Sequence, residues 1–135
     1  MSEPQIAYRI EETPGAAEVA ELYRNAGLRR PVDDLERIGR MIAHANLIVC
    51  ARDGGRLVGI ARALTDFSYC CYLSDLAVDA DYQRQGVGKA LIERVQEAIG
   101  EEAMLLLLSV PSAMPYYPHV GFQAVENGWT IPRRR

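Results

Sequence analysis

Apolar residues recur at two different spacings along the chain, and these spacings predict where helices and strands lie. Spacings of three and four residues predict three helices. The first follows Pro14 and ends at Gly27, and the last ends at Gly100. The second is predicted to begin near Asp33, because Glu36 follows it at the spacing of a capping box.

Other apolar runs predict strands. AYRIEE alternates apolar and polar residues, and LIVCA, RLVGIARAL, SYCCYLSDLAV and MLLLLSV are strand-like runs. The turn residues Asp53, Gly54 and Gly55 join two of them in a predicted hairpin. MLLLLSV is apolar almost throughout, which predicts an interior strand covered on both faces. Because a helix separates it from SYCCYLSDLAV, we expect these two strands to be parallel within a mixed sheet.

Length and composition indicate one globular domain spanning residues 1–135. The chain has 135 residues, of which 49% are hydrophobic and 24% charged. Its net charge of -3 makes nucleic acid an unexpected partner, since the only basic clusters are Arg29 with Arg30 and Arg133 to Arg135. No run is long enough to cross a membrane, and the N-terminus lacks the layout of a signal peptide, so we expect a cytoplasmic protein.

The cysteine and histidine content predicts no metal cofactor. The three cysteines are an odd number and lie within strand-like segments, as expected for buried thiols in a reducing compartment. His44 and His119 are far apart, and no cysteine pair has the spacing of metal ligands.

The stretch DYQRQGVGKAL joins an apolar run to the last predicted helix. A helix that begins after a glycine turn offers unpaired backbone N–H groups and a positive dipole end, which favour a phosphate. A Walker A loop would need glycine where Gln83 stands and serine or threonine where Ala90 stands. A dinucleotide-binding fingerprint would need glycine at Leu91. A tight corner with no ligand is the remaining alternative.

The residues from Gln83 to Gly88 follow the pattern Gln/Arg-x-x-Gly-x-Gly/Ala. In this they resemble the GNAT superfamily of acyl-CoA-dependent N-acetyltransferases, as does the surrounding LAVDADYQRQGVGKALIE. SAMPYYPHVGF, from Ser112 to Phe122, resembles the later motif of that family. The resemblance implies an α/β fold with a central mixed sheet of six to seven strands and about four helices. Its parallel strands would splay apart after Val78 around the cofactor.

The resemblance also implies acetyl-CoA as the co-substrate. The pyrophosphate would lie against the turn, and the pantetheine arm beside the preceding strand. The implied pyrophosphate residues are Gln83, Arg84, Gln85, Gly86, Val87, Gly88 and Lys89, and those beside the arm are Leu76, Ala77 and Val78. Backbone N–H groups near Leu76 would stabilise the oxyanion.

The implied reaction is direct attack of a primary amine on the thioester, and it needs a base. A lysine-like amine has a reference pKa of about 10.4, so a carboxylate acting through water is expected to remove its proton. Asp75 is the expected base, with Asp66 as the second choice. Pairing of Asp75 with a neighbouring arginine is the structural alternative.

The departing thiolate needs an acid, and Tyr117 is the expected donor. It stands five residues before Phe122, which matches the frequent catalytic tyrosine of the family, whereas Tyr116 is expected to point elsewhere. Pro118 disfavours an α conformation for Tyr117. The alternative for Tyr117 is therefore an aromatic side chain packed beside the sheet.

The acceptor stays open at this point. Tyr69, Tyr72 and Trp129 either line an aromatic-amine pocket or belong to the core, and the central sequence loosely resembles arylalkylamine-type acetyltransferases. Small amines, arylalkylamines, polyamines and protein or peptide amines all remain, and the acidic net charge predicts mild attraction of cationic ones. The alternative function is a non-catalytic acyl-CoA-binding regulatory module. The sequence is compatible with a monomer or a homodimer.

Overall fold

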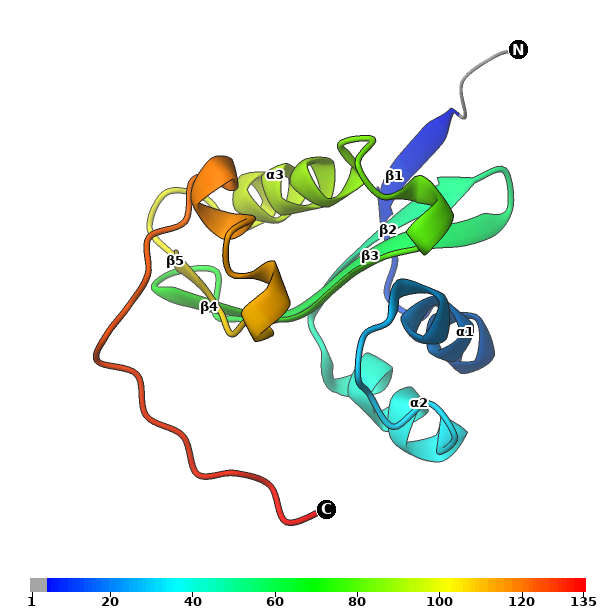
Figure 1. Ribbon diagram of the computed structural model, residues 1–135, viewed down its shortest axis with the longest axis horizontal. Coiled ribbons are helices and arrows are strands. Elements are labelled where there is room, and N and C mark those ends of the chain that lie inside the picture. The colour runs from blue at the N-terminus through cyan, green and yellow to red at the C-terminus, as the bar shows by residue number, and fades with distance from the viewer. Residues whose placement is uncertain (1–4) are drawn as a thin grey trace.

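One mixed sheet of five strands organises the computed structural model, which describes residues 5–135 (Figure 1). In spatial order the strands are β1 Ile6–Ile10, β2 Leu47–Asp53, β3 Arg56–Thr65, β4 Cys70–Val78 and β5 Met104–Leu107. Neighbours from β1 to β4 are antiparallel, and β4 pairs with β5 in parallel. Gly54 and Gly55 form the predicted turn between β2 and β3.

Three α-helices cover the two faces of the sheet. α1 (Ala16–Ala26) and α2 (Leu35–His44) lie on one face, and α3 (Val87–Ile99) on the other (Figure 1). Strand β2 shows how one strand contacts helices on both faces, because alternate residues of a strand point to opposite faces. Val49 belongs to the cluster under α3, whereas Ile48 belongs to the cluster under α1 and α2.

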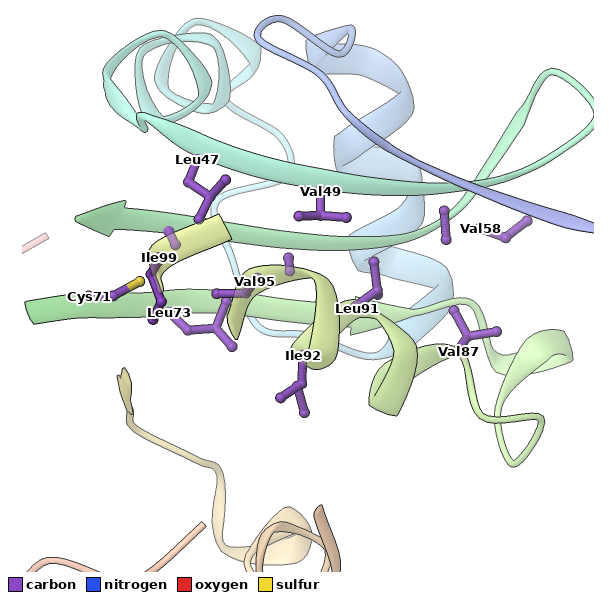
Figure 2. Close-up of a cluster of buried hydrophobic side chains, with 13 residues drawn as sticks. Leu47, Val49, Val58, Cys71, Leu73, Val87, Leu91, Ile92, Val95 and Ile99 are labelled. Carbon is purple, nitrogen blue, oxygen red and sulfur yellow. The ribbon is translucent and has the colours of Figure 1, made fainter. Parts of the chain in front are cut away.

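The face of α3 that meets the sheet is apolar along its whole length. Val87, Leu91, Ile92, Val95 and Ile99 are buried against strand residues, as Figure 2 shows. Their spacing of three and four residues is the one that predicted the helix. α3 carries the crossover from β4 to β5, so the predicted parallel pair is confirmed.

Four details of the predicted fold are wrong, and Cys70, one of the three cysteines expected to be buried, is exposed. The described chain has five strands and three α-helices, not six to seven and about four, because residues 123–135 form neither. β5 is an edge strand and not an interior one, since an apolar run does not reveal how many of its sides are covered. α2 is capped by Asp34, whose side chain accepts from the Arg37 N–H at 3.0 Å, and not by Asp33. The parallel strands separate after Leu73 and Leu107, before Val78.

A β-bulge at Ser74 changes the orientation of β4. The pairing with β3 passes from Leu73 opposite Ala63 to Asp75 opposite Arg62, so Ser74 is an extra residue. Leu73 therefore faces α3, whereas Asp75 and Ala77 face the other side. The bulge lies where β4 and β5 part.

Within residues 5–135, no α-helix has the length and apolar character needed to cross a membrane.

Candidate functional site

A pocket of about 1340 Å³ opens where β4 and β5 separate. It exceeds the roughly 300–1,000 Å³ of ordinary small-molecule sites, so it has room for two ligands. One side of it is the end of β4, the glycine turn (residues 83–88) and the start of α3. The other side is the connection between α1 and α2 together with α2 itself. Segment 107–120 closes it between them.

The start of α3 presents backbone donors that have no partner among residues 5–135. The first helical hydrogen bond of α3 runs from the Ala90 N–H to the Gly86 oxygen, at 3.0 Å. The N–H groups of Val87, Gly88 and Lys89 precede it, and no side chain caps this end. Together with the positive end of the helix dipole they form an anion-binding site.

The two glycines of this turn have different roles. Gly86 has φ 82°, a left-handed conformation that other residues adopt only with strain. Gly88 allows the Tyr116 side chain to approach the backbone closely, because a Cβ at residue 88 would lie 3.0 Å from the Tyr116 hydroxyl oxygen. Tyr116 was expected to point elsewhere, and this expectation is wrong: its hydroxyl lies beside the start of α3.

The edge of β4 beyond Leu73 is open toward the pocket. Because β5 pairs with β4 only from Cys70 to Leu73, the main chain of the following residues has no strand on that side. The Gln83 side chain donates to the Val78 oxygen at 3.0 Å, and Arg30 donates to the Ser74 oxygen at 2.8 Å. An extended ligand can therefore pair with the main chain between these two positions.

Most of the residues expected at the cofactor line this pocket. They are Leu76, Ala77, Val78, Gln83, Arg84, Gly86, Val87, Gly88 and Lys89. Gln85 is the exception, since its side chain turns back to the Asp81 oxygen at 3.3 Å and does not line the pocket. The structure thus brings the strand residues and the turn residues to one surface.

Asp75, the expected base, lies beneath the pocket and not in it. Its side chain is 0% exposed. It accepts hydrogen bonds from Arg30 Nε at 2.6 Å, from Arg62 Nε at 2.5 Å and from the Tyr23 hydroxyl at 2.6 Å. Burial favours the neutral acid, but the hydrogen bond and charge of Arg62, the Tyr23 hydroxyl and the charge of Arg30 outweigh it and lower the pKa of Asp75. A carboxylate with these partners is a poor proton acceptor.

Asp66, the second choice, organises the turn before β4. Hydrogen bonds from the backbone N–H groups of Cys70, Ser68 and Tyr69 lower the pKa of Asp66 to about 2. Asp66 does not line the pocket. Its position gives it no path to an acceptor amine there.

Tyr117 lines the pocket and is half-buried. It begins the 3₁₀ helix Tyr117–Val120, so Pro118 occupies the first turn, where a proline is tolerated. The ring packs edge-on against Tyr116 and Phe122, with centroids 5.3 and 5.5 Å away. Burial, and then the neighbouring Tyr116, raise the pKa of Tyr117, which keeps its phenol protonated at neutral pH.

Six of the arginines that line the pocket were missed as site residues by the sequence analysis, whereas Arg84 and Lys89 were expected at the cofactor. Eight of the fifteen Lys and Arg residues line it, and within residues 5–135 no Asp or Glu does. They are Arg29, Arg30, Arg37, Arg62, Arg84, Lys89, Arg133 and Arg135. The available signals were Arg62, a charged residue inside the apolar run RLVGIARAL, and the basic clusters Arg29 with Arg30 and Arg133 to Arg135. The prediction of mild attraction for cationic acceptors does not suit this lining.

Neither alternative for the three aromatic residues holds, because they form no common pocket and all three are exposed and not in the core. Tyr72 lines the pocket, but Tyr69 and Trp129 are 80% and 94% exposed and lie outside it. Within the part of the chain described, no three His, Cys, Asp or Glu side chains gather as a metal site would require.

The chain belongs to the GNAT acetyltransferase family. The sequence model of the acetyltransferase (GNAT) domain matches residues 19–129. The glucosamine 6-phosphate N-acetyltransferase of Trypanosoma brucei brucei is 30% identical over 82% of this chain and 70% of its own length. Three plant relatives, among them the chloroplastic GCN5-related N-acetyltransferase 2 of Arabidopsis thaliana, match 54% of the chain, which spans only 29% to 32% of their length.

Solved structures share the α/β fold. A GNAT-family acetyltransferase of Streptococcus pneumoniae has a TM-score of 0.80 at 24% identity, covering 97% of this chain and 100% of its own. An aminoglycoside N-acetyltransferase solved in complex with CoA has a TM-score of 0.75 at 19% identity, covering 99% and 98%. At these identities the likeness concerns the fold.

Proposed function

We propose that this chain transfers the acetyl group of acetyl-CoA to a primary amine by direct attack. The observation that carries the proposal is one pocket with three features: the free N–H groups at the start of α3, the open edge of β4 and the side chain of Tyr117. The N–H groups suit a pyrophosphate, and the open edge of β4 suits an extended pantetheine arm. The third is a protonated phenol beside them.

The reaction needs little from side chains beyond orientation. The amine nitrogen attacks the thioester carbonyl carbon, and the backbone N–H near Leu76, on the open edge of β4, stabilises the oxyanion. When the carbon–sulfur bond breaks, Tyr117 protonates the thiolate, whose reference pKa is about 8.5. The products are an N-acetylated amine and CoA.

The proton of the acceptor ammonium leaves through water in this proposal. Among residues 5–135 no Asp or Glu side chain lines the pocket, and Asp75 is held by Arg30, Arg62 and Tyr23. We therefore propose a positioning role for Asp75 in place of the base role. It ties β4 at the bulge to the α1–α2 connection through Arg30 and to β3 through Arg62.

The acceptor class remains that of primary amines. The relative from Trypanosoma brucei brucei is named for a phosphorylated amino sugar, which adds amino sugars to the classes worth assaying. An arylalkylamine loses its structural support, because Tyr69 and Trp129 lie outside the pocket.

Titration of acetyl-CoA by calorimetry tests the cofactor part of the proposal. Gly86→Glu places a carboxylate at the start of α3, where it repels a pyrophosphate, and we expect binding to be lost. Gly54→Glu is the matched control, because Gly54 also has a left-handed φ, of 61°, but lies in the β2–β3 turn outside the pocket. It carries the same charge and the same strain.

Equal binding by both variants, or no binding by the wild type, would overturn the cofactor site. Release of CoA thiol that depends on an added amine then tests transfer. Binding of acetyl-CoA without such release from any primary amine would favour the non-catalytic acyl-CoA-binding module.

A further inference from the structure

Positive charge is concentrated in the pocket although the chain as a whole is acidic. The net charge is -3, yet more than half of the Lys and Arg residues line this one cavity, and no Asp or Glu of residues 5–135 does. Arg84 and Lys89 lie at the start of α3, where a pyrophosphate accounts for them. The charge on the opposite side needs a different explanation.

Four arginines, Arg29, Arg30, Arg37 and Arg62, form what we call the arginine group. Three come from the α1–α2 side, and Arg62 comes from β3. Arg30 and Arg62 share the single carboxylate of Asp75, so this part of the group keeps a net charge of about one unit. Arg62 also donates to the Met41 oxygen at 3.2 Å, which ties α2 to the same place.

Arg29 has no carboxylate partner within residues 5–135. The Arg37 guanidinium donates to the terminal main-chain oxygen of Arg135, at 3.2 Å, and the Arg29 side chain is exposed at the pocket. Guanidinium groups that are not neutralised suit bidentate binding of a carboxylate or phosphate.

We infer that the acceptor amine carries an anionic group, a phosphate or a carboxylate, which the arginine group binds. The inference rests on the proposed acetyl transfer and names the substrate class of that same pocket. The anionic group lies toward Arg29 and Arg37, and the amine lies toward the open edge of β4. Acceptors that carry only positive charge are repelled by the same surface.

The arginine group also explains how an amine can react without a carboxylate base. Nearby positive charge disfavours the ammonium form and lowers the pKa of the bound amine. A larger fraction of the acceptor is then neutral and nucleophilic, and its proton passes to water. The anionic group compensates for this repulsion by holding the acceptor in place.

Matched pairs of amines test the charge preference. Glucosamine 6-phosphate is compared with glucosamine, and 4-aminobutanoate with 4-aminobutanamide, by the acetyl-CoA-dependent release of thiol. We expect kcat/KM to be about 10- to 100-fold higher for the anionic member of at least one pair, the range of one charge-assisted hydrogen bond. The pair that responds distinguishes phosphate from carboxylate. Equal or higher kcat/KM for both neutral members would overturn the inference.

Charge variants then locate the preference. Arg37→Gln and Arg29→Gln should raise KM for the anionic acceptor about tenfold or more, while the dissociation constant of acetyl-CoA stays unchanged. Arg40→Gln is the control, because Arg40 is exposed on the same helix but does not line the pocket. Weaker acetyl-CoA binding with an unaltered anion preference would assign these arginines to the cofactor and overturn the inference.

Equilibrium binding separates this inference from the proposed activity. The four amines and inorganic phosphate are titrated into the CoA-bound protein and into its Arg37→Gln variant. Binding of the anionic compounds that depends on Arg37, without turnover of any amine, would retain the anion site and reject acetyl transfer. Turnover of neutral amines with no binding of any anion would retain acetyl transfer and reject the anion site.

Discussion

Two polar regions lie on opposite sides of β4 and satisfy their hydrogen bonds in opposite ways. Beneath the strand, both oxygens of Asp75 are held by Arg30, Arg62 and Tyr23. Beside the strand, the first N–H groups of α3 and the main-chain edge after Leu73 have few partners or none in the part of the chain that the structure describes. The polar groups of the first region satisfy one another's hydrogen bonds, whereas those of the second need a ligand to do so.

This difference is the reason why we propose a positioning role, and not a base role, for Asp75. Asp75 stands one residue before the predicted oxyanion donor Leu76, so its place in the sequence suggested a catalytic carboxylate. Its partners instead make it a fixed charge that joins β4 to α1 and to the α1–α2 connection. Backbone N–H groups left unpaired at a helix start are instead suited to binding an anionic ligand.

The largest expected effect is a loss of stability on removing the charge of Asp75 from the buried region beneath β4. Asp75→Asn leaves the Arg62 guanidinium buried beside a neutral amide, and we expect the free energy of unfolding to fall by about 3–5 kcal/mol. Urea denaturation followed by circular dichroism measures it. Tyr23→Phe removes one hydrogen bond and no charge, and should cost about 1–2 kcal/mol.

A catalytic base role for Asp75 makes the opposite prediction. The variant would then lose kcat and keep its urea midpoint. That outcome would contradict the distinction between the two regions, because the buried region around Asp75 would then also carry the chemistry.

The next effect concerns the region that needs a ligand. Tyr117→Phe removes the phenol proton but keeps the ring between Tyr116 and Phe122. We expect kcat to fall about 100-fold with an unchanged dissociation constant for acetyl-CoA. Steady-state kinetics beside calorimetry test this. Tyr116→Phe is the companion variant, and a larger loss of kcat there would transfer the acid role to Tyr116.

The smallest effect is a pH dependence of stability. The pKa of Asp75 is lowered on folding, so its contribution is fully present above its unfolded pKa of about 3.9 and is lost as the pH falls through the folded pKa. The stability difference between wild type and Asp75→Asn should therefore be constant from about pH 5 to 8 and shrink below about pH 4. A difference that shrinks between about pH 5 and 8 would mean that the pKa of Asp75 is raised instead.

Local features could be predicted from the sequence, and distant ones could not. The residues of the glycine turn are contiguous, so the turn could be found as a sequence motif. The spacing of apolar residues in α3 predicted its buried face. The partners of Asp75 are different, because Tyr23 and Arg30 are 52 and 45 residues away. Only the folded chain brings them together.

The charge of the pocket escaped prediction for a similar reason. Arg29, Arg37 and Arg62 belong to different elements, and the acidic net charge of the whole chain pointed the other way. The edge position of β5 was missed because four apolar residues have the same pattern whether one strand or two lie beside them. Net charge and the length of an apolar run describe the chain or a segment as a whole. A site depends on where the individual side chains and strands lie in the folded chain.

The extra residue at Ser74 also limits how this chain can change in length over generations. Deleting it would exchange the two sides of the rest of β4 and turn Asp75 toward the apolar layer under α3. We expect related sequences to tolerate insertions and deletions between α1 and α2 far better than between Leu73 and Asp75. A single lost codon there would be more damaging than most substitutions.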